Sequence, residues 1–483
     1  MRKFSRNLAF GLSFLALLLA VLTIPHSHGK RELSALRSIL QARGEKLTLL
    51  VLSPPPATNR EDVLAREILS TNGLTLPGII PAQPQYDSPG RARVAWGPGS
   101  KIDLLVMGTA PSTNEEWSLL ESALSRQMDL VLGLQTALKT PPGDAGFPQR
   151  DPRQLPKLDF ALVRQFSQVL GTTVLVDLHA SRWEAAHANL SALVNVAQVN
   201  RNLFQLVAQM VRIGAAQIAL DATWQALQAP GWNEASLRSL QELWAQMDLA
   251  AVPERALAGE LAAGVDTFQR AHSAGGKEFR RNILYNSFEK SSFQTMAFDH
   301  VVLPAYKAFT LDEDEVFFLH SMTNFLYDVR QIQQHAAWPE VNALLKQHTA
   351  EWDHSVMSVA FHRYVLSERL MANYSKAIEL MVQTETRRQL TLTAIALQRY
   401  HLASGKHPTG LSALVPEFLP ALPLDPMSGK SLGYRATPNG EYVLYSTGED
   451  GVDNGGEAGL GLWTGRDAVF PSLAIARTPP PTP

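Results

Sequence analysis

The chain has no cysteine in its 483 residues. This absence excludes disulfides, thiol nucleophiles and cysteine-ligated metals. An excess of positive charge is also lacking, because 43 Lys and Arg face 45 Asp and Glu, for a formal net charge of −2. A nucleic-acid-binding protein is expected to carry a basic surface. The composition therefore predicts no nucleic-acid partner.

Common catalytic motifs are missing too, since neither G-x-S-x-G nor a P-loop occurs. The strongest candidate set for a metal or catalytic site is His348, Glu351 and His354, whose successive members would be neighbours on a helix. Their spacing is not His-Glu-x-x-His, and a polar helix face is the simpler interpretation. We therefore predict a non-enzymatic protein. A cryptic hydrolase with a site in the helical region is the alternative.

One long hydrophobic run is present, over residues 8–24, and Arg2, Lys3 and Arg6 precede it. Positive charge before an apolar run favours a cytoplasmic N-terminus. No A-x-A cleavage signal follows the run. We predict that residues 1–29 form a signal anchor, which makes the protein single-pass in a membrane with its bulk on the side away from the cytoplasm. A cleaved signal peptide is the alternative.

The predicted fold is mainly α, with a small C-terminal α+β module. Residues 30–112 are mixed and proline-rich, whereas residues 113–375 show helical patterning. Within this helical body, Asn233 is a good N-cap, and the acidic run 312–315 suits a first helical turn. The module covers residues 376–475, and a proline-rich tail, 476–483, is predicted to be disordered.

The module is predicted to pair one helix with one antiparallel hairpin. Its helix, 387–408, is apolar on most sides, and Asn439-Gly440 separates two aromatic-rich runs at 432–437 and 441–446. Asn-Gly between such runs is a strong hairpin signal. A loop of glycine and acidic residues, 444–457, follows directly.

This loop has the composition of a calcium site. Calcium takes six to eight oxygen ligands, including backbone carbonyls that glycine can turn inward. The spacing of the acidic residues is not that of an EF-hand. A solvated turn, with aspartates bonded to nearby backbone, is the alternative.

The order of features over residues 380–470 resembles the globular part of the major pseudopilin of type II secretion systems. The segments are QRYHLASGKHPTGLSALVP, LPLDPMSGKSLGYR and YVLYSTGEDGVDNGGE. The residues that match the family's pattern are Tyr400, Gly405, Pro408, Leu411, Leu414, Pro423, Asp425, Pro426, Tyr434, Tyr442, Ser446, Gly448, Asp450 and Gly451. The resemblance implies calcium binding, with Asp450 and Asp467 as the two loop aspartates. Asp453 is a further oxygen donor in the loop.

The N-terminus, MRKFSRNLAFGLSF, lacks the prepilin-peptidase site of that family, so we do not expect a filament subunit. The layout as a whole, with the phrase VRIGAAQIALDATWQALQAPGW, resembles large membrane-anchored proteins of planctomycetes and verrucomicrobia. Both resemblances are to bacterial proteins, and they imply a bacterial inner membrane with the bulk of the chain on the periplasmic side. The resulting hypothesis is an envelope protein that binds protein partners, in association with a type II secretion-like assembly. A helical peptide-binding scaffold is a further alternative.

Overall fold

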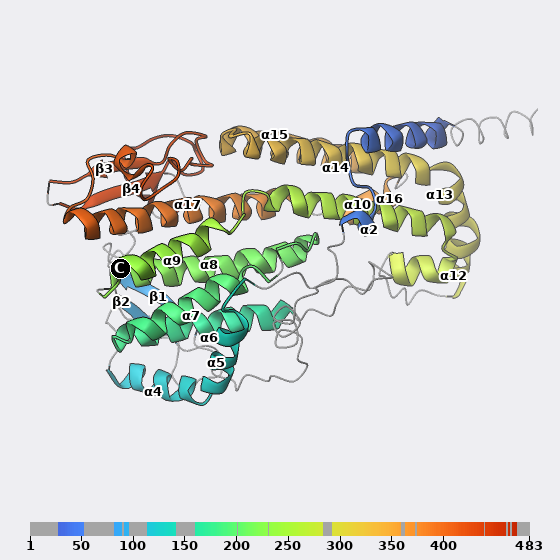
Figure 1. Ribbon diagram of the computed structural model, residues 1–483. Helices are drawn as coiled ribbons and strands as arrows, with labels where there is room; N and C mark the ends of the chain where they lie inside the picture. Colours follow the sequence, from blue (N-terminus) through green and yellow to red (C-terminus); the bar gives the residue numbers. More distant parts are fainter. Residues whose placement is uncertain are drawn as a thin grey trace, which may run out of the picture. The chain divides into compact units, whose positions relative to one another are not determined.

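The computed structural model describes residues 28–52, 82–88, 91–95, 114–141, 160–199, 201–229, 231–283, 292–358, 363–371, 374–438, 440–459, 462–463 and 466–470. The chain forms two compact units, and Figure 1 shows their helices and strands. Unit 1 comprises Met1–Leu52, Glu254–Asp328 and Leu344–Ser375, and unit 2 comprises Ser53–Pro253, Val329–Ala343 and Lys376–Pro483. The helical body predicted over 113–375 is therefore divided between both units.

The prediction of a mainly α fold with a small sheet is confirmed. The helices of unit 1, some of which continue into unit 2, are 28–42, α2 (Leu49–Leu52), α10 (Val252–Ser273), α11 (Gly276–Glu278), η1 (Phe279–Ile283), α12 (Ser292–Ala297), η2 (Phe298–Val302), α13 (Leu303–Phe309), α14 (Leu311–Gln333), α15 (Trp338–Ser358) and α16 (Val365–Leu370).

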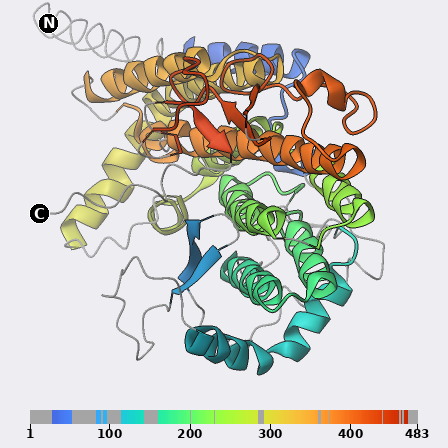
Figure 2. The same ribbon diagram turned by 90° about the vertical axis from the view of Figure 1, so that its left-hand side faces the viewer.

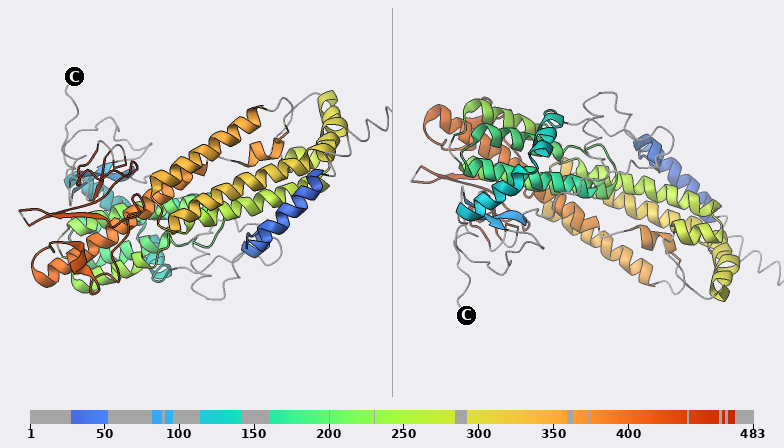
Figure 3. Two further views of the ribbon diagram at one scale, coloured as in Figure 1. Left: turned by 90° about the horizontal axis from the view of Figure 1, so that it is seen from above. Right: turned by 90° about the horizontal axis from the view of Figure 1, so that it is seen from below.

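Unit 1 is organised around the start of α14, where the predicted acidic run lies in the first helical turns. In this run Asp312, Asp314 and Glu315 are buried, and Glu313 is half-buried. Glu315 accepts a hydrogen bond from Arg37 Nε at 2.9 Å, which fixes helix 28–42 beside α14 (Figure 3). Asp314 accepts bonds from the backbone N–H groups of Leu366 and Ser367 at 2.8 and 3.1 Å, which fix α16. Burial raises the pKa of Asp314 to about 6, although these bonds lower it.

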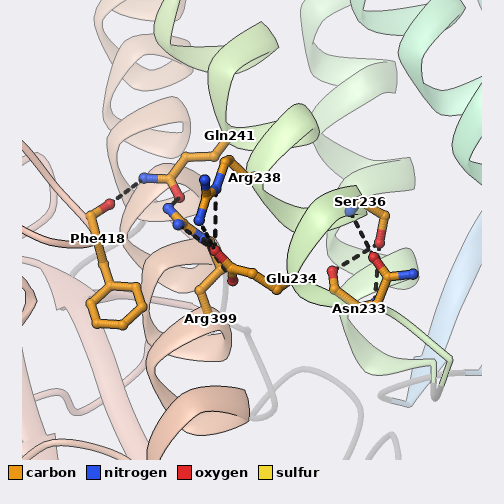
Figure 4. A network of polar contacts seen from close by, with 7 residues as sticks. All are labelled: Asn233, Glu234, Ser236, Arg238, Gln241, Arg399 and Phe418. Carbon is orange, nitrogen blue, oxygen red and sulfur yellow. Dashed lines mark hydrogen bonds and ion pairs between the residues drawn. The ribbon is translucent and has the colours of Figure 1, made fainter.

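Unit 2 begins with a set of helices and an antiparallel strand pair, β1 (Ala82–Ser88) with β2 (Arg91–Ala95). The helices are α4 (Asn114–Ser125), α5 (Met128–Ala137), α6 (Phe160–His179), α7 (Trp183–Val196), α8 (Leu206–Gln228) and α9 (Glu234–Ala245). The predicted cap of α9 is present. The Asn233 side chain accepts from Ser236 N at 2.9 Å, and the Ser236 hydroxyl accepts from Asn233 N at 3.1 Å (Figure 4).

The C-terminal part of unit 2 packs a three-stranded antiparallel sheet on α17 (Tyr374–Ser404) (Figure 2). The predicted hairpin is β3 (Gly433–Ala436) with β4 (Tyr442–Ser446), and Tyr434 pairs with Leu444. A third strand, β5 (Ala468–Phe470), pairs with β4 and was not predicted. The shared core includes Leu397 from α17 and Leu414 from the 3₁₀ helix η3 (Leu411–Leu414).

A buried arginine connects α17 to α9. Arg399 is 6 % exposed and donates to Glu234 Oε1 at 3.0 Å and to Gln241 Oε1 at 2.9 Å (Figure 4). Its guanidinium also lies 5.3 Å from the ring centroid of Phe418. Gln241 in turn donates to the Phe418 carbonyl at 2.7 Å. α17, which contains the helix predicted to be apolar on most sides, therefore carries a buried charge that is paired and hydrogen-bonded by neighbouring side chains.

We predict that Gly264→Ala destabilises unit 1 by about 1–3 kcal/mol, because overpacking a buried contact has this cost. A Cβ at Gly264 of α10 would stand 2.1 Å from Phe318 Cζ of α14, and Phe318 is 1 % exposed. The matched control is Gly214→Ala in α8, where a Cβ meets nothing within 4 Å and better helix propensity stabilises by about 0.5–1 kcal/mol. Urea unfolding of the two variants should shift in opposite directions; shifts of the same sign would contradict this packing.

Candidate functional site

A cleft of about 590 Å³ lies within unit 2. This volume falls in the range of about 300–1,000 Å³ that is typical of ligand sites. Four stretches of the chain contribute to its walls: the end of α9 with residues 248–251, the end of α14, the middle of α17, and the segment 419–429. Most of the side chains that face the cleft are apolar, among them Leu249, Ile332, Met381, Val382, Leu392 and Leu422.

A charge pair on α17 lines the cleft. Glu385 and Arg388 are three residues apart, which places both on one helix face, and they are 4 % and 8 % exposed. Arg388 Nε and Nη2 donate to the two Glu385 carboxylate oxygens at 2.7 and 2.8 Å, and Nη1 donates to the Trp244 carbonyl at 2.9 Å. Burial lowers the pKa of Arg388, but the charge of Glu385, the hydrogen bonds to Glu385 and the charge of Asp248 together raise it, so the net shift of the pKa is upward. The pair is a fixed, internally neutral polar group in a largely apolar lining.

One buried carboxylate positions the segment 419–429. Asp425 is 1 % exposed. Its side chain accepts bonds from Met427 N at 3.0 Å, Ser446 Oγ at 2.7 Å and Thr447 N at 3.1 Å. The last two partners belong to the end of β4 and the residue after it, so Asp425 ties this wall to the sheet. Prolines at 420, 423 and 426 restrict the backbone of the same segment.

The end of α14 and the residues just after it form another wall of the cleft. This wall contains a residue in the left-handed backbone conformation. His335 has φ 66°, which is uncommon outside glycine. Ala336 N donates to the Gln331 carbonyl at 3.0 Å, so the helix closes with a tight cap. The His335 carbonyl oxygen lies 2.3 Å from where a Cβ of Gly429 would stand, so only glycine allows this approach. A non-glycine residue in this conformation costs about 1–3 kcal/mol, and such strain is concentrated at functional sites.

The cleft therefore combines apolar walls, a rigid proline-containing segment and a small number of fixed polar groups. This is the usual composition of a binding site, in which apolar surface supplies affinity and a few polar groups orient the ligand. The sequence patterns did not predict this cleft. An available signal was the pair Glu385 and Arg388, two charges near the start of a helix that is otherwise predicted to be apolar on most sides.

The predicted calcium ligands gather in one loop but bond to backbone. Asp467, 1 % exposed, accepts from Asn454 N at 3.0 Å and Gly456 N at 2.7 Å. Asp453 Oδ1 accepts from Gly455 N at 2.8 Å, and Asp450 Oδ1 accepts from Val452 N at 3.0 Å. Burial raises the pKa of Asp467, the backbone bonds lower it, and the charges of Asp453 and Asp450 raise it again.

These contacts show three neighbouring carboxylates that are each held by N–H groups. Within the described ranges, no three or more His, Asp or Glu side chains form a group able to hold a metal ion. A cation at this loop would have to draw the carboxylates together from their present N–H partners. Calcium binding by Asp450, Asp453 and Asp467 stays a prediction.

The structure brings together only part of the predicted set His348, Glu351 and His354 in α15. His348 Nδ1 lies 3.3 Å from Glu351 Oε2, and its Nε2 lies 3.3 Å from Asp328 Oδ2 on α14. Asp328 is 2 % exposed, and burial raises its pKa while the His348 charge lowers it. His354 and Glu351 are exposed. The sequence did not reveal the partner Asp328. The contact of His348 with Asp328 joins α15 to α14, which gives His348 a structural role.

The apolar run 8–24 of the predicted signal anchor, residues 1–29, lies outside the described residues, which begin at residue 28. Across the part of the chain that the structure describes, none of the helices is both long enough and apolar enough to cross a bilayer.

We predict that Asp425→Asn destabilises unit 2 by about 2–3 kcal/mol, because hydrogen bonds to a buried charged group contribute about 1.5–3 kcal/mol. The asparagine amide would keep one acceptor oxygen, but its N–H₂ group would face N–H or O–H donors that now bond to the Asp425 carboxylate. Glu417→Gln is the matched control, since Glu417 is exposed in the same region. Urea unfolding measures both; equal midpoints for the two variants would show that Asp425 does not position the segment.

The calcium prediction has a separate test on the full chain. Millimolar calcium, compared with chelator, should stabilise the protein by about 1–2 kcal/mol if extracellular-type affinity holds, because a ligand bound only by the folded state shifts unfolding. Asp450→Asn should remove that difference while leaving the melting temperature in chelator nearly unchanged. Identical melting temperatures with and without calcium in the parent protein would eliminate the site.

Comparison with known proteins gives no relative from which a role could be transferred: no family model, no curated protein and no solved structure matches this chain.

Proposed function

We propose that the protein is a non-enzymatic, membrane-anchored protein of the bacterial cell envelope that binds an extended apolar segment of a partner protein in the cleft of unit 2. The single observation that carries the proposal is the cleft itself, with its apolar lining and its fixed polar pair. The compartment comes from the basic residues and apolar run at the N-terminus.

A peptide suits this cleft because the walls are already ordered. Asp425 holds the segment 419–429, and the end of α14 contacts Gly429. Binding to a rigid surface loses little conformational entropy, so more of the interaction energy appears as affinity. The left-handed conformation of His335 supports the same proposal, since glycine at this position would end α14 without backbone strain.

The partner is expected in the cell envelope, and the resemblance of residues 380–470 to a pseudopilin favours a secretion-like assembly. Residues of that pattern, Asp425 and Ser446, bond directly to each other. The same segment forms one wall of the cleft. The pattern and the proposed binding site therefore share residues, which supports a role for the module in recognition rather than in filament growth.

We expect a photo-crosslinker in the cleft to capture an envelope protein in intact cells. The absence of cysteine makes any introduced thiol unique. Ala245→Cys places the thiol at an exposed position of the cleft, and Leu402→Cys places it at a position of α17 that is 46 % exposed and is not among the residues that line the cleft. Labelling both with a maleimide benzophenone gives a matched pair.

The expected result is a discrete adduct from position 245 that is absent from position 402 and contains a peptide of an envelope protein. Ala421→Trp should reduce its yield, because Ala421 is exposed at the cleft and a large ring there blocks entry. Equal adducts from both positions, or adducts with cytoplasmic proteins alone, would refute the proposal.

A further inference from the structure

Three apolar side chains of unit 1 are exposed together on α12 and η2. Met296 is 54 % exposed, Val301 is 65 % exposed and Val302 is 52 % exposed. Met296 lies near the end of α12 (Ser292–Ala297), and Val301 and Val302 end η2 (Phe298–Val302), which follows α12 directly in the chain. We name these three residues the valine patch. Single exposed apolar residues need no explanation, whereas adjoining ones mark an interaction surface.

The valine patch lies at the end of unit 1 where the chain arrives from its N-terminus. A Cβ on Gly29 would stand 3.1 Å from Glu313 Cγ, so residue 29 lies against the start of α14. The seven residues of α13 connect η2 to that point, a distance of about 10 Å at the usual helical rise. The apolar run 8–24 ends only a few residues before helix 28–42.

The charges beside the valine patch are mainly basic. Arg280 of η1 pairs with Asp299 of η2, and the rings of Phe279 and Phe298 lie 6.3 Å apart, so η1 adjoins η2. Burial lowers the pKa of the Lys307 amine, and the charge of Glu278 raises it. Besides Glu278 and the paired Arg280, the described residues 277–281 carry two positive charges, on Lys277 and Arg281, and both side chains are exposed.

We propose that the valine patch inserts into the headgroup region of the same membrane that holds residues 8–24, with Lys277 and Arg281 facing anionic lipid. Apolar side chains flanked by basic ones bind such surfaces, and each basic residue near an anionic leaflet adds attraction. The inference rests on the proposed membrane anchor. A surface contact of this kind would orient unit 1 on the bilayer instead of leaving it on a free tether.

The test uses the full chain reconstituted in vesicles of phosphatidylcholine and phosphatidylglycerol. Val301→Cys carries an environment-sensitive nitrobenzoxadiazole label, and Val207→Cys is the matched control, a 58 % exposed valine on α8 of unit 2. We expect a blue-shifted emission at position 301 and its loss on adding nitroxide-labelled lipid, with neither change at position 207. Omitting phosphatidylglycerol should weaken both effects.

Two failures are distinguishable by flotation of the same vesicles. Protein that floats with the vesicles while the label at 301 stays in water would overturn the valine patch and leave the anchor intact. Protein that does not float would overturn the anchor and this inference with it. Equal quenching at positions 301 and 207 would also overturn it, because the label itself would then explain the insertion.

Discussion

The structure of unit 2 depends on the pairing of the charges that α17 carries into its interior. Glu385, Arg388 and Arg399 are nearly inaccessible to water, and a buried charge without a partner would cost several kcal/mol. Hydrogen bonds fix the position of each of these side chains. Arg388 donates to Glu385 and to the Trp244 carbonyl, and Arg399 donates to Glu234 and Gln241. These contacts fix the position of α9 and of the segment after η3 relative to α17.

This constraint explains why the cleft has well-defined walls. Gln241 links the Arg399 network to the Phe418 carbonyl, immediately before the segment that forms one side of the cleft. Asp425 holds the other end of that segment against β4. A wall fixed at both ends cannot close into the space beside it, so the cleft persists, and the left-handed His335 is retained beside it despite its conformational cost.

Local signals in the sequence predicted the local features of the fold. The cap at Asn233, the acidic start of α14 and the hairpin of β3 with β4 each depend on neighbouring residues and are confirmed. The third strand was missed because its pairing with β4 spans the loop 447–467. The cleft could not be predicted at all, since its walls come from four distant stretches. Calcium binding by the loop aspartates stays a prediction, and their backbone N–H partners depend on glycine conformations that composition does not reveal.

The two proposed surfaces strengthen each other through local concentration. A protein confined to a membrane meets other proteins of that membrane at a far higher effective concentration than a free one, and a short or stiff connection raises it further. Contact of the valine patch with lipid would shorten the effective tether by orienting unit 1. A cleft of ordinary ligand size could then hold a partner segment with modest intrinsic affinity and still be occupied. The same cleft on an untethered protein would need a higher intrinsic affinity to be occupied to the same extent.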